Sequence, residues 1–177
     1  MVFTQDMILD RALRDPPSSE EELERLGDFK SKEYELIVLG QRLYNEQKIP
    51  FEAFKAQMEA ELGEPFSFSR AGKMYSTRPA KVTLQRLYQH PKYCIHAIES
   101  LGWCGEFRVR ICEGKHHQIR RMAQRSKLMV LSLTRTHIAG ILRLDSIPKV
   151  GQGRWLLQHE IDTLRRGLGL VEEDTLL

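Results

Sequence analysis

The hydrophobic period of the sequence changes at Gly114, and this change constrains the fold more than any other feature. Residues 106–114 (EFRVRICEG) alternate between apolar and polar side chains, which is typical of a strand with one buried face. Residues 117–127 (HQIRRMAQRSK) instead place Ile119 and Met122 at helical spacing, with Ala123 beside them. The apolar residues of both the strand and the helix are expected to face inward. The strand residues expected to be buried are Phe107, Val109 and Ile111.

Further strands and helices are predicted along the rest of the chain. Strands are expected at 32–40, at 80–88 and twice within 127–144, and helices at 5–15, 50–63 and 153–169. Residues 18–31 and 63–80 are expected to be loops, the first with at most one helical turn, residues 2–4 resemble the end of a strand, and 90–105 is ambiguous. The pattern predicts an α+β fold, with a mixed or antiparallel sheet and flanking helices, as a single domain over residues 1–177.

Spacing within these elements predicts which side chains face the core. In the strand at 32–40, Tyr34 shares one face with Leu36 and Val38. The apolar residues expected to pack inward from the helices are Ile8, Ala12 and Leu13 in the first, and Phe51, Phe54, Met58 and Leu62 in the second.

Charge is distributed unevenly along the chain, although the formal net charge is only +3. From Gly114 to Arg154 there are nine Lys and Arg and a single acid, Asp145, so this segment carries +8. The remainder has 18 Lys and Arg against 23 acids, which gives −5. Each phosphate that a basic side chain neutralises releases counterions, so a basic segment of this kind favours a polyanionic partner. A solvated charged face is the alternative.

Cysteine usage and hydropathy indicate the compartment. Cys94, Cys104 and Cys112 are odd in number and lack CxxC spacing, which argues against a disulfide framework. No apolar run approaches the length of a membrane span, and the first residues lack the basic flank and apolar core of a signal peptide. We therefore expect an intracellular protein in a reducing compartment, without a membrane partner.

Residues 113–122 (EGKHHQIRRM) crowd histidines and basic side chains at the predicted strand-to-helix turn, and a metal site is the first alternative there. Structural zinc sites have paired ligands at spacings such as CxxC, which Cys104, Cys112, His116 and His117 do not provide. Adjacent histidines are also expected to point in different directions. The chain shows no GxSxG elbow and no Gly-rich phosphate loop either. No metal is therefore predicted at this turn.

An RNA-binding surface explains the cluster better. Lys115, His116, His117 and Gln118 lie in the turn, where they and the free N–H groups of the first helical turn can contact one anionic group. Glutamine and histidine also hydrogen-bond base edges and the 2′-hydroxyl. Arg120, Arg121 and Arg125 extend the positive surface along the helix. The last two stand at i,i+4 and repel each other unless an anion lies between them.

Several segments together resemble a known family. EGKHHQIRRM is similar to E-G-(K/R)-x-x-Q-(I/V)-(R/K)-R-M, and LTRTHIAGILRLDSIPKVGQGRW is similar to L-x-R-x-x-I-G-x-(I/L)-x-L with its Pro/Gly turn and basic-aromatic close. VFTQDMILDRAL, SKEYEL and STRPAKVTL resemble three further pieces of the same pattern. The pattern is that of the pseudouridine synthases of ribosomal RNA, in the branch that usually carries an N-terminal S4 domain. The resemblance is specific over 106–157, fair over 2–14 and 31–39, and poor over 41–76 and 86–104; it covers the C-terminal part of the catalytic domain, and no S4 domain is present.

The resemblance implies a reaction and roles for individual residues. In this family an aspartate attacks the target uridine, the glycosidic bond breaks, and the base is rotated and rejoined through C5 without a cofactor. Tyr34 matches the tyrosine that lies against the target base, and Arg120 matches the basic residue that pairs with the aspartate. The residues assigned to the RNA surface are Lys32, Lys115, His116, His117, Gln118, Arg121, Arg125 and Arg135. Ribosomal RNA is the expected partner, in the cytoplasm or in an organelle with its own ribosomes.

The nucleophilic aspartate of the family is missing from this sequence. The family motif G-R-L-D-x-x-T-x-G-L-L would precede the segment that begins with residues 1–4. RLDS occurs at 143–146, but it follows the EGKHHQIRRM stretch and lacks T-x-G, so Asp145 is interpreted as non-catalytic. The expectation is a portion of a synthase that a missing N-terminal half or a second chain completes. The alternative is a catalytically inactive protein that binds RNA or assists ribosome assembly.

Overall fold

The computed structural model describes residues 7–43, 49–89, 102–147, 149 and 152–170. The described residues group into two compact units within the span that the sequence predicts as one domain. Unit 1 is drawn from Met1–Lys32, Cys112–Gly114 and Thr136–Leu177, and unit 2 from Glu33–Ile111 and Lys115–Arg135. The expected strand end at residues 2–4 and most of the ambiguous stretch at 90–105 lie outside the described residues.

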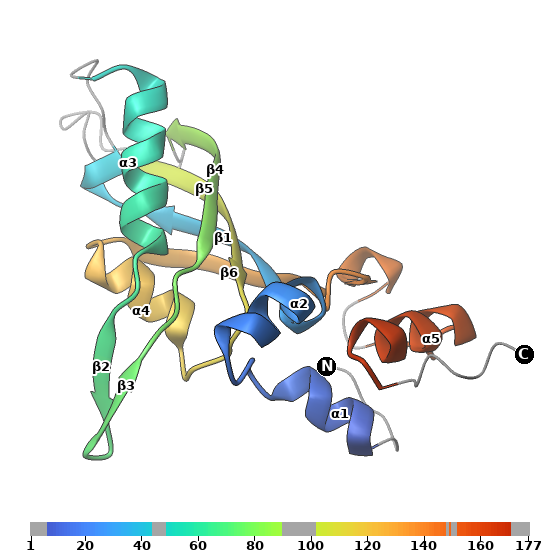
Figure 1. Ribbon diagram of the computed structural model, residues 1–177. Helices are drawn as coiled ribbons and strands as arrows, with labels where there is room; N and C mark the ends of the chain where they lie inside the picture. The colour runs from blue at the N-terminus through green and yellow to red at the C-terminus, as the bar shows by residue number, and fades with distance from the viewer. Residues whose placement is uncertain (1–6, 44–48, 90–101, 148, 150–151, 171–177) are drawn as a thin grey trace, which may run out of the picture. The chain divides into compact units, whose positions relative to one another are not determined.

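Unit 2 is built on an antiparallel sheet with the strand order β4-β5-β1-β6 (Figure 1). Gly40 N–H donates to the carbonyl of Trp103, and Tyr34 meets Arg135, so the N-terminal end of β1 faces the C-terminal ends of both its neighbours. The predicted α+β architecture with an antiparallel sheet and flanking helices is confirmed. The strands are β1 (Lys32–Leu39), β4 (Lys81–Gln89), β5 (Trp103–Ile111) and β6 (Met129–Ile138), joined by the 3₁₀ turn η1 (Gln41–Leu43) and the helices α3 (Phe51–Gly63) and α4 (Gln118–Arg125).

Helices α3 and α4 pack on one face of this sheet and enclose the core of unit 2. The predicted inward residues of β5 are buried, and so are Leu36 and Val38 of β1, with Tyr34 packed against them. From α4 the core takes Ile119, Met122 and Ala123, as their spacing predicts. Phe51 was expected to pack inward from α3 but is exposed, because it is the first residue of the helix, beyond the reach of the sheet.

The prediction of a loop over residues 63–80 is wrong. Strands β2 (Ser67–Arg70) and β3 (Lys73–Ser76) form an antiparallel hairpin, with Phe68 opposite Tyr75. The turn between them consists of Ala71 and Gly72, both at positive φ (48° and 74°), as a two-residue primed turn requires. Apolar and polar residues do alternate in these strands, but each has only four residues and little burial, so the signal is weak.

Replacing Ala71 with asparagine is expected to stabilise the hairpin. An L-residue with a β-carbon pays about 1–2 kcal/mol for the left-handed conformation, which asparagine tolerates better. We expect Ala71→Asn to raise the free energy of unfolding by about 0.5–1 kcal/mol in urea denaturation. Ala71→Val is the matched control and should lower it, because a β-branched residue is strained at positive φ. Equal stability of the two variants would contradict this explanation of the turn.

Unit 1 has a second, smaller apolar core. The elements of unit 1 are α1 (Met7–Arg14), α2 (Glu20–Lys30), the end of β6 paired with β7 (Leu142–Arg143), η2 (Leu144–Ser146) and α5 (Gln158–Gly167). Leu9 and Leu13 of α1 pack with Leu142 and Leu164. Ile8 was expected to face inward with Leu13, but it is 68% exposed and Leu9 takes its place. None of the helices among the described residues has the length and apolar character needed to cross a membrane.

Residues 20–30 are a helix, so the prediction of a loop over 18–31 is wrong. Ser19 caps α2, since its Oγ accepts a hydrogen bond from the N–H of Glu22 at 3.1 Å. The Glu22 carboxylate in turn accepts from the hydroxyl of Ser18 at 2.6 Å and from its N–H at 2.7 Å, and these two hydrogen bonds lower the pKa of Glu22. Lys30 closes the helix with a buried ammonium group that donates to the carbonyls of Ala12 (2.8 Å) and Asp15 (3.1 Å). The helix thus depends on its caps and not on an apolar stripe, so hydrophobic periodicity does not predict it.

Glu160 is expected to make the stability of unit 1 depend on pH. Arg154 donates two hydrogen bonds to this carboxylate (2.7 and 2.5 Å) and the N–H of Leu157 a third (2.8 Å), which together lower its pKa to about 2. Because the unfolded value is about 4.3, the contribution is complete above about pH 5 and is lost as the pH falls towards 2.

The matched variant is Glu160→Gln, measured by urea denaturation at several pH values. The wild type should exceed the variant by about 1–2 kcal/mol at pH 7, a figure that allows for solvent screening of the pair. The difference should vanish near pH 2. A difference that stays constant over this pH range would show that the carboxylate charge does not stabilise the fold.

Candidate RNA-binding and catalytic site

The histidines of the predicted RNA surface lie at the start of α4, in unit 2. His117 precedes the helix in the left-handed conformation (φ 55°), and its ring stacks on that of His116 with centroids 3.9 Å apart and planes 7° apart. The expectation that adjacent histidines point in different directions is therefore wrong here, because the positive φ of His117 turns its side chain alongside its neighbour. Both residues are exposed and present one stacked imidazole surface.

The positive charges around His116 are only partly compensated. Desolvation, together with the charges of Arg70, His117 and Arg121, lowers the pKa of His116 below its usual value. Of these causes desolvation is the largest, and the charge contributions come from basic side chains that an anion at this position would also contact. The start of α4 is therefore electrostatically suited to a phosphate group.

Gln118 is turned into the protein and does not join the surface. It is only 3% exposed, and its Oε1 accepts a hydrogen bond from the N–H of Lys115 at 3.2 Å. The backbone N–H of Gln118 donates to the carbonyl of Lys115 at 3.0 Å. The N–H groups of Ile119 and Arg120 have no hydrogen-bond partner within the described part of the chain. These two amides are the ones that α4 leaves for an anion.

The three arginines of α4 have different surroundings. Arg120 is exposed and makes no ion pair or hydrogen bond with any described residue. Arg121 lies over the ring of Phe68, with Cζ 4.4 Å from the centroid. Arg125 lies over Phe66 (5.3 Å) and donates to the carbonyls of Glu61 (2.6 Å), Glu64 and Pro65. Stacking on these two rings explains how like charges at i,i+4 coexist, and it leaves Arg120 as the unengaged cation of the helix.

Tyr34 and Arg135, which come from distant parts of the sequence, meet on neighbouring strands of unit 2. The guanidinium Nε of Arg135 donates to the Tyr34 hydroxyl at 3.0 Å, and its Cζ lies 5.2 Å from the ring centroid. Arg135 is exposed, whereas Tyr34 is half-buried against the core. The contact fixes the orientation of the ring, and the hydroxyl keeps its own proton to donate.

The remaining candidates lie in unit 1. Lys32 is half-buried, and its Nζ lies 3.7 Å from the position that a Cβ on Gly114 would occupy. Asp145 forms a bidentate pair with Arg143 (3.0 and 2.6 Å), which lowers the pKa of the aspartate and keeps it ionised. Both side chains of the pair are largely exposed, so this carboxylate lies on a solvated surface.

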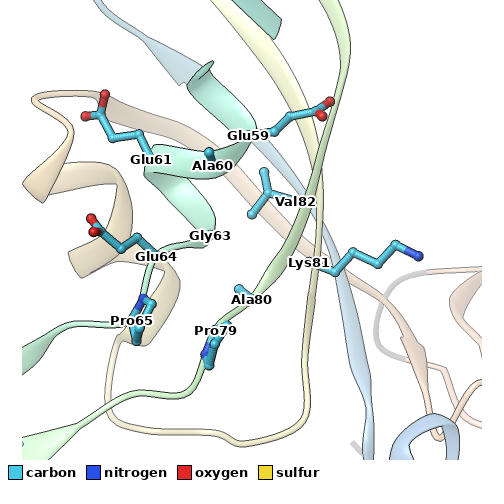
Figure 2. A pocket seen from close by; sticks show the side chains of 10 residues that line it. All are labelled: Glu59, Ala60, Glu61, Gly63, Glu64, Pro65, Pro79, Ala80, Lys81 and Val82. Atoms are coloured by element: carbon cyan, nitrogen blue, oxygen red, sulfur yellow. The ribbon is translucent and has the colours of Figure 1, made fainter. Parts of the chain in front are cut away.

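An open cavity of about 640 Å³ lies in unit 2 between the end of α3 and the start of β4 (Figure 2). No predicted site residue lines it. Its glutamates are engaged within the protein: Glu59 accepts from the N–H of Leu84 (2.7 Å), Glu61 pairs with Arg42 (2.5 Å) and Glu64 with Arg125 (3.3 Å). Lys81 extends away from Glu61 and Glu64. The acidic lining makes this cavity unsuitable for a phosphate.

Metal ligands are not assembled in the part of the molecule that the structure describes. No group of three or more His, Cys, Asp or Glu side chains there could hold an ion. Cys104 is buried, where desolvation raises the pKa of its thiol, and Cys112 donates to the carbonyl of Gly27.

The β2–β3 hairpin brings aromatic and basic side chains to the start of α4. The sequence pattern did not predict these residues as part of the site. Phe68 stacks on Tyr75 (5.6 Å, 21°) and contacts Phe66 (5.9 Å), while Lys115 donates through Nζ to the carbonyl of Ser76. The signal available in the sequence was the alternation of FSFSR and KMYS about Gly72. These contacts join the hairpin to the start of α4.

Comparisons with known proteins find a likeness at the level of structure. No family model matches the chain, and no curated protein matches it. Among solved structures, the chain is similar to one described as a crystal structure of pseudouridylate synthase, with 19% sequence identity and a TM-score of 0.43. The alignment covers 81% of this chain and 49% of that one, so the chain spans about half the length of that protein. A likeness of this size describes the arrangement of strands and helices and not a binding or catalytic site.

Proposed function

We propose that this chain is the RNA-facing portion of an RNA pseudouridine synthase that acts on uridine, with ribosomal RNA as its substrate. The observation that carries the proposal is the hydrogen bond between Tyr34 and Arg135, 101 positions apart in the sequence. These two residues come from separate motifs, SKEYEL and LTRTHI; the resemblance matches Tyr34 to the tyrosine against the target base, and Arg135 is assigned to the RNA surface. Their contact on adjacent strands supports the proposal, because it brings a residue of the predicted base pocket next to one of the predicted RNA surface.

In the proposed reaction Tyr34 lies against the target uracil, and Arg135 holds the ring in place. The uridine has to leave its stack to reach this position, and contacts to the base and the flanking backbone offset the cost of unstacking. The backbone contacts are supplied by the exposed histidines at the start of α4. No cofactor takes part, because the released base is itself the nucleophile that forms the new bond through C5.

Arg120 is assigned to pair with the nucleophilic aspartate of the family. Arg120 has no carboxylate partner among the described residues, and the motif that would carry the aspartate is not in this sequence. Asp145 is already held by Arg143 in unit 1. The nucleophile is therefore expected to come from a segment that precedes this sequence or from a second chain.

The deciding measurement is release of tritium from RNA labelled at C5 of uridine. The 177-residue chain is expected to bind the RNA and release no tritium, whereas the chain preceded by its in-frame upstream sequence should release it. Release by the 177-residue chain alone, abolished in Asp145→Asn, would overturn the assignment of the nucleophile. Failure of both forms to bind RNA would overturn the proposal as a whole.

A second candidate is an RNA-binding protein without isomerase activity, which assists assembly of a ribosomal particle. The unengaged guanidinium of Arg120 favours it, since such a residue serves phosphate binding without any catalytic partner. RNA binding by both forms of the chain, with no tritium release by either, would favour this candidate over the synthase.

A further inference from the structure

One face of the β2–β3 hairpin gathers aromatic and basic side chains. Side chains alternate between the two faces of a strand, so Phe68 and Arg70 share a face with their cross-strand partners Tyr75 and Lys73. Arg121 of α4 lies over Phe68 on this face, and the positive charge of Arg70 is one of the causes that lower the pKa of His116. The opposite face carries serines and Met74. We refer to Phe68, Arg70, Lys73, Tyr75 and Arg121 together as the hairpin platform.

Part of the platform has a structural explanation. The stack of Tyr75 on Phe68 stabilises the pairing of two short strands, and Arg121 over Phe68 fastens the hairpin to α4. These contacts account for Phe68. They do not account for an aromatic ring at Tyr75 that remains 37% exposed, nor for the basic pair beyond it.

Arg70 and Lys73 stand directly opposite each other next to the turn. Like charges in this position destabilise a sheet. Neither residue, nor Arg121, has a carboxylate partner among the residues that the structure describes. Three cations around an exposed aromatic ring are unfavourable in the free protein and favourable once phosphates lie between them.

We propose that the hairpin platform binds an unpaired RNA strand, in which one base extends the Phe68–Tyr75 stack while the flanking phosphates lie against Arg70, Lys73 and Arg121. This inference rests on the proposed function, because it names the element that holds the RNA strand next to α4. An aromatic ring combined with nearby cations suits a single strand, whose bases are free to stack. In an A-form duplex the bases are paired and the major groove is too deep and narrow for side chains to read.

The test measures fluorescence anisotropy of a labelled oligouridylate of about 12 nucleotides with the full chain. Tyr75→Ala is expected to weaken binding by about 5- to 100-fold, the effect of losing one stacked base, without changing the salt dependence. Tyr75→Phe should restore the affinity, since it keeps the ring. Arg70→Gln should instead reduce the slope of log K against log salt by about 0.7, the contribution of one phosphate contact on a single strand.

Met74→Ala is the matched control, because Met74 is 70% exposed on the opposite face of the same hairpin. Its affinity should equal that of the wild type. Equal affinities of Tyr75→Ala and Met74→Ala would overturn the proposal, and so would tighter binding of a duplex of the same length. A Tyr75→Phe variant as weak as Tyr75→Ala would also overturn it, because the hydroxyl and not the ring would then bind.

Arg120→Glu separates this inference from the proposed function. If Arg120→Glu binds RNA more weakly while the hairpin variants bind like the wild type, the proposal for the hairpin platform is overturned and the role of α4 in RNA binding is supported. If the wild type binds no RNA, the proposed function and the platform fall together. Weak binding by both sets of variants supports both.

Discussion

Charge reversal at Arg120 is expected to weaken RNA binding on the order of tenfold without lowering the stability of the chain. Arg120 is exposed in the first turn of α4, beside the two N–H groups that the helix leaves unbonded. In the Arg120→Glu variant, a phosphate bound at this position would no longer contact a guanidinium and would be repelled by a carboxylate. Because the side chain makes no ion pair or hydrogen bond with any described residue, its replacement removes no polar interaction from the fold. The slope of log K against log salt should also fall by about 0.7 or more.

The matched control is Arg25→Glu, which changes the net charge by the same amount. Arg25 is exposed in α2, among acidic residues. Its reversal should leave RNA affinity within about twofold of the wild type, since only side chains that neutralise a phosphate contribute in this way and Arg25 is not among those predicted to do so. Equal losses in Arg25→Glu and Arg120→Glu would mean that net charge governs binding, and Arg120 would have no specific role.

Arg125 is a poor choice for the same experiment, although it belongs to the same helix. Its guanidinium donates to three carbonyls at the end of α3 and pairs with Glu64. A carboxylate at this position would face those carbonyls, so Arg125→Glu is expected to destabilise unit 2. A loss of RNA affinity in that variant could not be separated from a loss of structure.

The parts of the fold that could be predicted are those with a strong apolar period. β1, β5, α3 and α4 each bury one face in a single core, and this burial determines which residues alternate and which recur every three or four positions. α2 and the β2–β3 hairpin bury little, and they depend on Ser19, on Glu22 and on a two-residue turn. Such elements are specified by a few local hydrogen bonds and dihedral angles, to which hydrophobic spacing is insensitive.

The candidate site was predictable in composition but not in arrangement. The sequence identified the basic residues of α4 but not their contacts. Gln118 is buried because its side chain accepts from the N–H of Lys115 at the helix start, and Arg125 donates to the carbonyl of Glu61 in α3. The hydrogen bond between Tyr34 and Arg135 likewise depends on the pairing of β1 with β6. Only the tertiary structure separates a charge that is free to bind RNA from one that already holds the protein together.

Replacing Phe107 with alanine is expected to lower the free energy of unfolding of unit 2 by about 3–5 kcal/mol. Phe107 is 1% exposed at the centre of β5, in the core that α3 and α4 cover. Its ring also fills the space beside Gly105, where an added Cβ would come within 2.6 Å of Phe107 Cε2. Gly105→Ala should therefore destabilise the wild type by about 1–3 kcal/mol through overpacking.

The double variant tests whether Phe107 and Gly105 share this space. Once the Phe107 ring is gone, the methyl group at position 105 has room, so Gly105→Ala should cost at least about 1 kcal/mol less than it does in the wild type. Urea denaturation followed by far-ultraviolet circular dichroism gives the four free energies of the cycle, with Val130→Ala, at a half-buried position of β6, as a control in place of Gly105→Ala. Strict additivity of the two changes would contradict the packing of Phe107 over Gly105.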